Sequence, residues 1–298
     1  MIGVAATVTA LAGRRGRPHP EGESLDAVIS LPGAEPWSAA GRGRRARTAV
    51  VVLHGFTANP TGTRPLGQRL AAAGYRVEVP CLPGHGTTPR DLATTRYADW
   101  YAAAARLVAH LAATADAVVV IGHSMGGTIA LDLAARQPTT VRAVVTINPQ
   151  ILDRSGLLAA VAPVVSRVVP YLPRALAGLP TDDLVRSDVE EHAYGVIASR
   201  AAQSLLAELP RIRAQLLDVT QPLLVVRSRV DHTVDPANAR AVMELVGSPD
   251  LDEFVCERSY HVPLLDHDAR AVEERILAFL AGPARRGVPV ADDVRGGG

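Results

Sequence analysis

One serine lies in a glycine-rich turn between an apolar run and an amphipathic segment. The sequence GHSMGG at residues 122–127 follows the β-branched run 117–121 and contains Ser124. In a strand–turn–helix context, the pattern G-x-S-x-G exposes the serine hydroxyl on a strained turn, and its glycines remove side chains that would collide there. The helix that follows directs its first amides and its positive dipole end at the same point. The pattern predicts that Ser124 is a nucleophile; a glycine-rich structural turn or a phosphate-binding loop is the alternative.

A serine hydroxyl is a weak nucleophile without a general base, and the base needs an acidic group that orients it. After such a turn these partners come later in the chain, first the acid and then the histidine, at the ends of later strands. Of the four histidines that follow Ser124, one lies in a short loop between the run 253–256 and an amphipathic segment. That residue is His261, which we predict to be the general base; the other three are His192, His232 and His267.

Two aspartates compete for the role of the orienting acid. Asp231 lies in the loop directly after the apolar run 223–226, whereas Asp235 precedes Pro236. An aspartate followed by proline at the first helical position is typical of a helix N-cap. We therefore predict that Asp231 is the acid and keep Asp235 as the alternative.

The negative charge that develops on a carbonyl oxygen during acyl transfer needs two fixed N–H donors. One is expected to be the backbone amide of Met125, directly after the nucleophile. The second is expected from the loop HGFT that follows the run 48–53, where Gly55 lets the backbone approach the site closely. We nominate the amide of Phe56, for which simple core packing is the alternative.

Short β-branched runs alternate along the chain with longer amphipathic segments. This alternation, with several runs apolar on both faces, predicts an open, mostly parallel α/β sheet with helices on both sides. The expected strands are residues 48–53, 76–79, 117–121, 141–147, 223–226 and 253–256, and the expected helices are residues 64–73, 98–113, 125–136, 236–246 and 268–280.

The segment 149–213 interrupts this alternation. It has no convincing strand, and prolines break its apolar helical stretches. An insertion at this point is expected to form a small helical cap over the carboxyl edge of the sheet, where ligands bind in open α/β folds. The core is then formed by residues 31–148 and 214–281, between flexible tails at 1–30 and 282–298 that are rich in small residues, arginine or proline.

The composition argues against several classes of function. The formal net charge is +1, from 31 basic and 30 acidic residues, so no overall field attracts nucleic acid or an acidic membrane. All the basic residues are arginine, which excludes a Schiff-base lysine and a phosphate-loop lysine. The two cysteines and the irregularly spaced histidines favour neither a disulfide framework nor a metal site. No apolar stretch reaches the roughly 20 residues of a membrane span. We expect a cytoplasmic protein without a bound metal.

Five motifs together resemble the α/β-hydrolase superfamily and, within it, small bacterial carboxylesterases and monoacylglycerol lipases. The resemblance covers residues 31–280. The family's nucleophile, acid and base fall on Ser124, Asp231 and His261, and its oxyanion amides fall on Phe56 and Met125. The motifs are HGFT at 54–57, LPGHG at 82–86, GHSMGG at 122–127, RVDHTVDP at 229–236 and SYHVPLLD at 259–266.

The resemblance implies a serine hydrolase that cleaves carboxylic esters through an acyl-enzyme and needs no cofactor. Short to medium acyl esters, including monoacylglycerols, are the expected substrates. We expect a monomer or weak homodimer with no nucleic-acid partner and no stable membrane insertion. A thioesterase, a lysophospholipase or another acyl or C–C hydrolase of this fold is the alternative. Many members have an apolar residue in place of His123, and the segment 149–213 diverges too far to assign substrate contacts.

Overall fold

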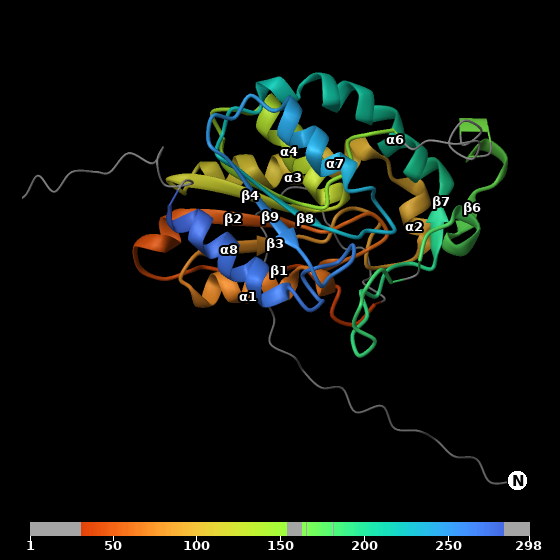
Figure 1. Cartoon of the computed structure of the whole chain (residues 1–298), viewed down its shortest axis with the longest axis horizontal. Coiled ribbons are helices and arrows are strands. Elements are labelled where there is room, and N and C mark those ends of the chain that lie inside the picture. Colours follow the sequence, from red (N-terminus) through yellow and green to blue (C-terminus); the bar gives the residue numbers. More distant parts are fainter. Residues whose placement is uncertain (1–30, 154–162, 165, 181, 283–298) are drawn as a thin grey trace, which may run out of the picture.

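A seven-stranded sheet forms the centre of the computed structural model, which describes residues 31–153, 163–164, 166–180 and 182–282 (Figure 1). Its strand order is β1-β3-β2-β4-β5-β8-β9. The edge strand β1 runs antiparallel to β3, and every other neighbouring pair is parallel. The strands are β1 (Trp37–Ala39), β2 (Thr48–Leu53), β3 (Arg76–Val79), β4 (Ala117–His123), β5 (Val141–Ile147), β8 (Leu223–Ser228) and β9 (Leu251–Cys256).

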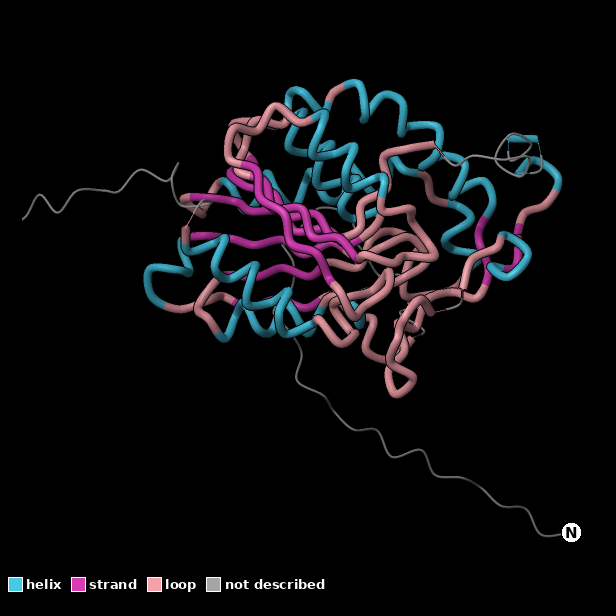
Figure 2. The backbone as a smooth tube through the Cα atoms, in the orientation of Figure 1, coloured by secondary structure: helices cyan, strands magenta, loops and turns pink. Residues whose placement is uncertain are grey.

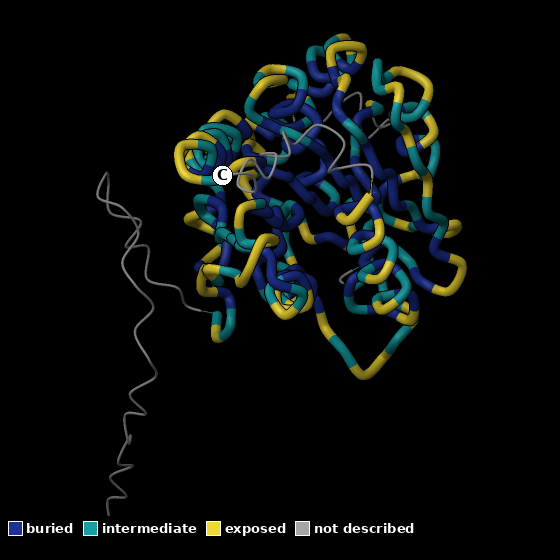
Figure 3. Tube along the Cα trace, turned by 90° about the vertical axis from the view of Figure 1, so that its left-hand side faces the viewer, coloured by how far each residue is buried: buried dark blue, intermediate teal, exposed yellow. Residues whose placement is uncertain are grey.

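Helices cover both faces of this sheet (Figures 1 and 2). The helices α3 (Tyr97–Ala112), α4 (Met125–Arg136) and α7 (Ala237–Leu245) pack on one face, and α1 (Arg64–Ala72) and α8 (Ala269–Ala281) pack on the other. The central strand β4 is therefore buried along its whole length, and Figure 3 shows this buried interior. Each face of the sheet packs against its own apolar cluster. The central strands are therefore apolar on both faces and do not alternate between polar and apolar residues.

The predicted open, mostly parallel α/β sheet is confirmed, and the bounds of β2, β3, β5 and α4 are those expected from the sequence. Outside the 149–213 segment, one strand and one α-helix were not predicted, β1 and α2 (Pro89–Thr94). The strand β1 has three residues and no β-branched side chain. The helix α2 begins at a Thr88 N-cap and has only six residues, too few to show a helical period. The short 3₁₀ helices are Gly43–Arg47, Pro60–Gly62, Arg174–Ala177 and Leu216–Asp218.

The prediction that the segment 149–213 contains helices and no strand is wrong in part. It contains helix α6 (Ser199–Ala214), but also the antiparallel pair β6 (Tyr171–Pro173) and β7 (Val196–Ala198). Pro170 and Pro173 prevent a helix there, and an edge strand tolerates proline. Figure 1 shows β6 and β7 to the right of the main sheet, beyond the ends of its strands.

Some expected features lie outside the described residues. These are both predicted tails, up to residue 30 and from residue 283, and several apolar positions of the 149–213 segment. Among the residues that the structure describes, no helix combines the length and the apolar character needed to cross a bilayer.

Candidate active site

Ser124 lies at the sharp turn between β4 and α4. Its backbone has φ 53° and ψ −118°, a conformation that non-glycine residues rarely adopt. The neighbouring glycines are required by close backbone packing: a Cβ on Gly122 would lie 2.0 Å from the Gly126 carbonyl oxygen, and one on Gly126 would lie 2.4 Å from that of Leu53. The Ser124 amide donates to the Ile147 carbonyl at 2.8 Å, which ties the turn to β5. These surrounding contacts hold Ser124 in its strained backbone conformation.

His261 and Asp231 form a buried pair at the ends of the neighbouring strands β8 and β9. Nδ1 of His261 lies 2.8 Å from Oδ2 of Asp231. The other carboxylate oxygen accepts hydrogen bonds from the amides of Thr233 and Val234 at 2.8 and 2.7 Å. A carboxylate can only accept here, so Nδ1 carries a proton and Nε2 of the neutral ring is left as an acceptor.

The contact between His261 and Asp231 shifts the pKa of both groups. Burial opposes the charged forms, but the attraction between the two groups and their hydrogen bond outweigh it. The pKa of His261 is therefore raised above 6.5, and the pKa of Asp231 is lowered below 3.8. The alternative acid, Asp235, instead accepts from the Ala237 amide at 2.8 Å and caps the start of α7.

Ser124 and His261 line one cavity of about 260 Å³. Phe56 and Thr57, from the loop after β2, form part of its wall, and residues of the 149–213 segment form another part. Two charged side chains, Arg174 and Glu191, interrupt an otherwise mainly apolar wall. Its apolar side chains include Leu172, Leu176, Leu179, Ile197, Leu205 and Leu206.

The loop after β2 lies against the serine turn. A Cβ on Gly55 would lie 3.2 Å from the Cβ of Ser124, so the Phe56 amide is carried close to the nucleophile candidate. Met125 is the first residue of α4, and both Phe56 and Met125 line the cavity. His54 fixes the loop: its Nδ1 contacts the Gly55 carbonyl at 2.9 Å and its Nε2 accepts from the Leu82 amide at 3.0 Å. Burial lowers the pKa of His54 to about 4, so it stays neutral.

Within the described residues, no group of three or more His, Cys, Asp and Glu side chains is arranged to hold a metal ion. Both cysteines are unpaired, and burial raises the pKa of each thiol, that of Cys81 to about 12. Neither thiol is suited to act as a nucleophile near neutral pH.

The serine aminopeptidase S33 family matches residues 44–268, most of the chain. The chain is an α/β-hydrolase of this family. A thermostable monoacylglycerol lipase from Bacillus sp. (strain H-257) is 34% identical over 251 residues, which cover 84% of the chain and 96% of that relative. A carboxylesterase from Bacillus subtilis (strain 168) is 26% identical, over 78% of the chain and 92% of the relative.

A solved structure has a similar fold and a similar sequence. It comes from work on two metagenome-derived lipolytic enzymes, LipS and LipT, and it is 33% identical with a TM-score of 0.78. The match covers 84% of this α/β-hydrolase and 98% of that chain. A monoacylglycerol lipase of Paleococcus ferrophilus, 19% identical with a TM-score of 0.69, has the same fold.

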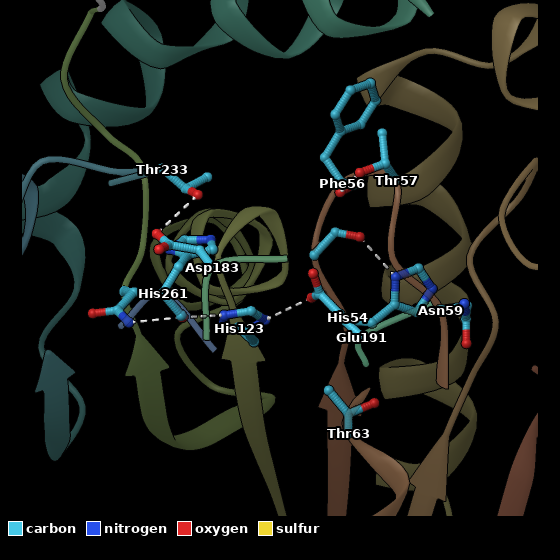
Figure 4. A network of polar contacts seen from close by, with 12 residues as sticks. His54, Phe56, Thr57, Asn59, Thr63, His123, Asp183, Glu191, Thr233 and His261 are labelled. Atoms are coloured by element: carbon cyan, nitrogen blue, oxygen red, sulfur yellow. Dashed lines mark hydrogen bonds and ion pairs between the residues drawn. The ribbon is translucent and has the colours of Figure 1, made fainter. Parts of the chain in front are cut away.

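Three residues of this α/β-hydrolase that the motifs do not assign also contact the site. The His261 carbonyl oxygen accepts from Nε2 of His123 at 2.8 Å and from Nδ2 of Asn148 at 2.9 Å. On its other side, Nδ1 of His123 faces Oε1 of Glu191 at 3.9 Å (Figure 4). Burial lowers the pKa of His123 to about 3, so His123 is neutral and acts as a hydrogen-bond donor through Nε2.

The 149–213 segment also holds the loop that carries the acid candidate. The buried Asp183 carboxylate accepts from the His232 amide at 2.8 Å and from the Thr233 hydroxyl at 3.1 Å (Figure 4). No sequence signal marked Asp183 or Glu191, because both lie in an irregular stretch whose path the local pattern does not determine. Asn148 could have been noticed, since it follows β5 at the same sheet edge as Ser124.

Proposed function

We propose that this carboxylic ester hydrolase acts through a catalytic triad of Ser124, His261 and Asp231. The observation that carries the proposal is the 2.8 Å contact of His261 with Asp231 beside a cavity that Ser124 also lines. The Ser124 hydroxyl attacks the ester carbonyl while Nε2 of His261 takes its proton. His261 then returns the proton to the leaving alcohol, and water, activated by the same nitrogen, hydrolyses the acyl-enzyme. Asp231 holds the imidazole tautomer and stabilises the imidazolium.

An oxyanion hole completes this proposal. The amides of Phe56 and Met125 belong to two elements that converge on Ser124, and fixed N–H groups stabilise the tetrahedral intermediate without reorganisation. The chemistry uses groups of the chain and water, and calls for no cofactor. The charge balance and the position of all three triad residues on one chain support a monomer or weak homodimer that binds no nucleic acid. The two unpaired cysteines suit a cytoplasmic location.

We further propose that residues 149–213 act as a cap over a core formed by residues 31–148 and 214–281. The cap's apolar wall is suited to an acyl chain, whereas the Glu191 carboxyl group is suited to a hydroxylated alcohol group. This division fits short and medium acyl esters, including monoacylglycerols. The names of the relatives, a monoacylglycerol lipase and a carboxylesterase, support the same substrate class.

Specificity is expected to rise with acyl length over short and medium chains. Each buried methylene contributes roughly 0.8 kcal/mol, about fourfold in binding, until the cavity is full. We expect kcat/KM to increase from acetyl to medium acyl esters in a series of p-nitrophenyl esters, and triacylglycerols to be poor substrates. Thioesters, lysophospholipids and aminoacyl anilides belong in the same panel, with anilides expected to be inert. A steady decline from acetate onward would leave only a small-ester esterase.

The role of Glu191 can be separated from that of the acyl wall. Replacing Glu191 by glutamine is expected to reduce kcat/KM for a monoacylglycerol by up to about tenfold, because it replaces one carboxyl oxygen by an NH₂ group and a single hydrogen bond contributes roughly 0.5–1.5 kcal/mol. The methyl ester of the same fatty acid has no free hydroxyl and should lose much less. Glu190→Gln, at an exposed neighbouring carboxylate, is the matched control. Equal losses for both esters would exclude recognition of the alcohol by Glu191.

The pH dependence follows from the raised pKa of His261. The base must be neutral, so kcat/KM is expected to fall as the pH drops through a pKa above 6.5. In Asp231→Asn the acid-side fall in the residual kcat/KM should move to a lower pH. Burial lowers the pKa of His261, and the variant lacks the carboxylate that compensates for this effect. Measuring kcat/KM from about pH 5 to 9 for both proteins tests this. An acid limb that moves to higher pH in Asp231→Asn would contradict the assignment.

A further inference from the structure

Thr57, the residue after Phe56, has an unfavourable backbone conformation. Its φ is 65°, in the left-handed region that a β-branched residue rarely enters. Such a conformation is strained and persists only where neighbouring groups hold it. The conformation of Thr57 helps to set the orientation of the Phe56–Thr57 peptide that precedes it.

Groups from the 149–213 segment hold Thr57 in this conformation. Nη1 of Arg174 donates to the Thr57 hydroxyl at 2.8 Å, and that hydroxyl donates to the Phe56 carbonyl oxygen at 2.5 Å. The Tyr194 amide donates to the Thr57 carbonyl oxygen at 3.0 Å. The first two bonds form a directional chain, in which each donor polarises the next. Both peptide groups that flank Thr57 are therefore fixed, and Figure 4 shows Phe56 and Thr57 side by side.

Arg174 is itself held rigidly. It follows β6 directly, its amide donates to the Gly195 carbonyl at 3.2 Å, and its Nε donates to the Pro180 carbonyl at 2.7 Å. The side chain is buried, with 7% of the residue exposed. Within the described residues its guanidinium makes no ion pair closer than 4.0 Å; the Glu191 carboxyl group of the same cavity is the acidic group on which its charge acts from farther away. A buried arginine without a close ion pair is costly, so an ordinary surface salt bridge does not account for it.

We infer that Arg174 is a positioning residue for the oxyanion hole. It orients the Thr57 hydroxyl, which holds the Phe56 carbonyl and so fixes the Phe56–Thr57 peptide. This limits rotation about the backbone of Phe56, and with it the orientation of the adjoining Gly55–Phe56 peptide that carries the Phe56 N–H. The inference rests on the proposed oxyanion role of Phe56. A correctly placed amide contacts the negative oxygen more strongly in the transition state than it contacts the ester carbonyl. Loss of Arg174 should therefore lower kcat and leave KM nearly unchanged.

The test compares Arg174→Met with a matched arginine from the same segment. Arg213 in α6 also donates hydrogen bonds to a backbone carbonyl, that of Ile151, and to a carboxylate, that of Asp153. It is not among the residues that line the cavity. Active sites are titrated with a fluorophosphonate, so that kcat refers to folded enzyme only. We expect Arg174→Met to lose about 10- to 100-fold in kcat, less than the ~10²–10³ for a deleted oxyanion donor, with KM within about threefold. Arg213→Met should keep the kcat of the wild-type enzyme per titrated site.

A second pair of variants keeps the test decisive if Arg174→Met does not fold. Thr57→Val retains the shape and branching of the side chain but removes the hydroxyl, whereas Thr57→Ser retains the hydroxyl. We expect Thr57→Val to show the same loss of kcat, and Thr57→Ser to restore most of it. In the double variant Arg174→Met/Thr57→Val the loss should be close to that of either single variant, because both break one chain of hydrogen bonds.

An unchanged kcat per titrated site in both Arg174→Met and Thr57→Val, or an effect confined to KM, would overturn the inference. Failure of the proposed function has a different signature, namely that the wild-type enzyme neither hydrolyses esters nor reacts with the fluorophosphonate. Additive losses in the double variant would show that Arg174 acts elsewhere than through Thr57.

Discussion

Replacing Ser124 by alanine is expected to lower kcat for ester hydrolysis by about 10⁶-fold, the scale seen when the serine of a triad is removed. The variant lacks the hydroxyl group that forms the acyl-enzyme in the proposed mechanism. Stability should change little, because Ser124 is not fully buried and alanine tolerates the turn about as well as serine does. Some catalysis by the oxyanion hole and by binding persists in such variants.

The assay requires protein free of contaminating esterases, because a trace of host enzyme would mask so large a loss. Single-turnover kinetics with a p-nitrophenyl ester and a thermal melt together give activity and fold. Ser248→Ala, outside the cavity, serves as the control and should behave like the wild-type protein. Turnover of Ser124→Ala within tenfold of the wild-type rate would show that the nucleophile lies elsewhere.

Asp231→Asn is expected to reduce kcat by about 10⁴-fold, the effect of amidating the orienting acid of a triad. The asparagine can present its NH₂ group to Nδ1 of His261, which favours the tautomer whose Nε2 is protonated and unable to accept the serine proton. The two backbone donors, Thr233 and Val234, can still bind the amide oxygen, so the loop should keep its shape.

The matched control for this variant is Asp235→Asn, four residues later. Asp235 accepts from the Ala237 amide at the start of α7, and asparagine caps helices about as well as aspartate. We expect activity and melting temperature close to those of the wild-type enzyme. The reverse pattern, with Asp235→Asn inactive and Asp231→Asn active, would assign the acid to Asp235.

The sheet could be predicted from the sequence because its strands are buried on both faces. Runs such as Val118 to Ile121 are continuously apolar, which distinguishes them from the amphipathic helices between them. The serine turn was recognisable for a related reason, since the close contact between Gly122 and Gly126 leaves no room for other residues. Candidate acid and base residues followed from chain order, because the carboxyl ends of parallel strands share one edge.

The 149–213 segment could not be predicted in the same way. Its β6–β7 pair depends on partners that are 23 to 27 residues apart, from Pro173 with Val196 to Tyr171 with Ala198, and neither strand shows an alternating pattern of its own. The contacts of Arg174, Asp183 and Glu191 with the site depend on where the irregular connection between those strands runs. Tertiary packing, rather than local propensity, determines that path.

The central claim is that Ser124 is a nucleophile activated by His261, and covalent labelling tests it most directly. The wild-type protein is treated with a fluorophosphonate, and intact-mass and peptide mass spectrometry then give the number and position of the adducts. We predict one adduct per chain, on Ser124, formed much more slowly in Asp231→Asn and not at all in Ser124→Ala. An adduct on another residue, or ester hydrolysis that continues unchanged without labelling of Ser124, would contradict the mechanism.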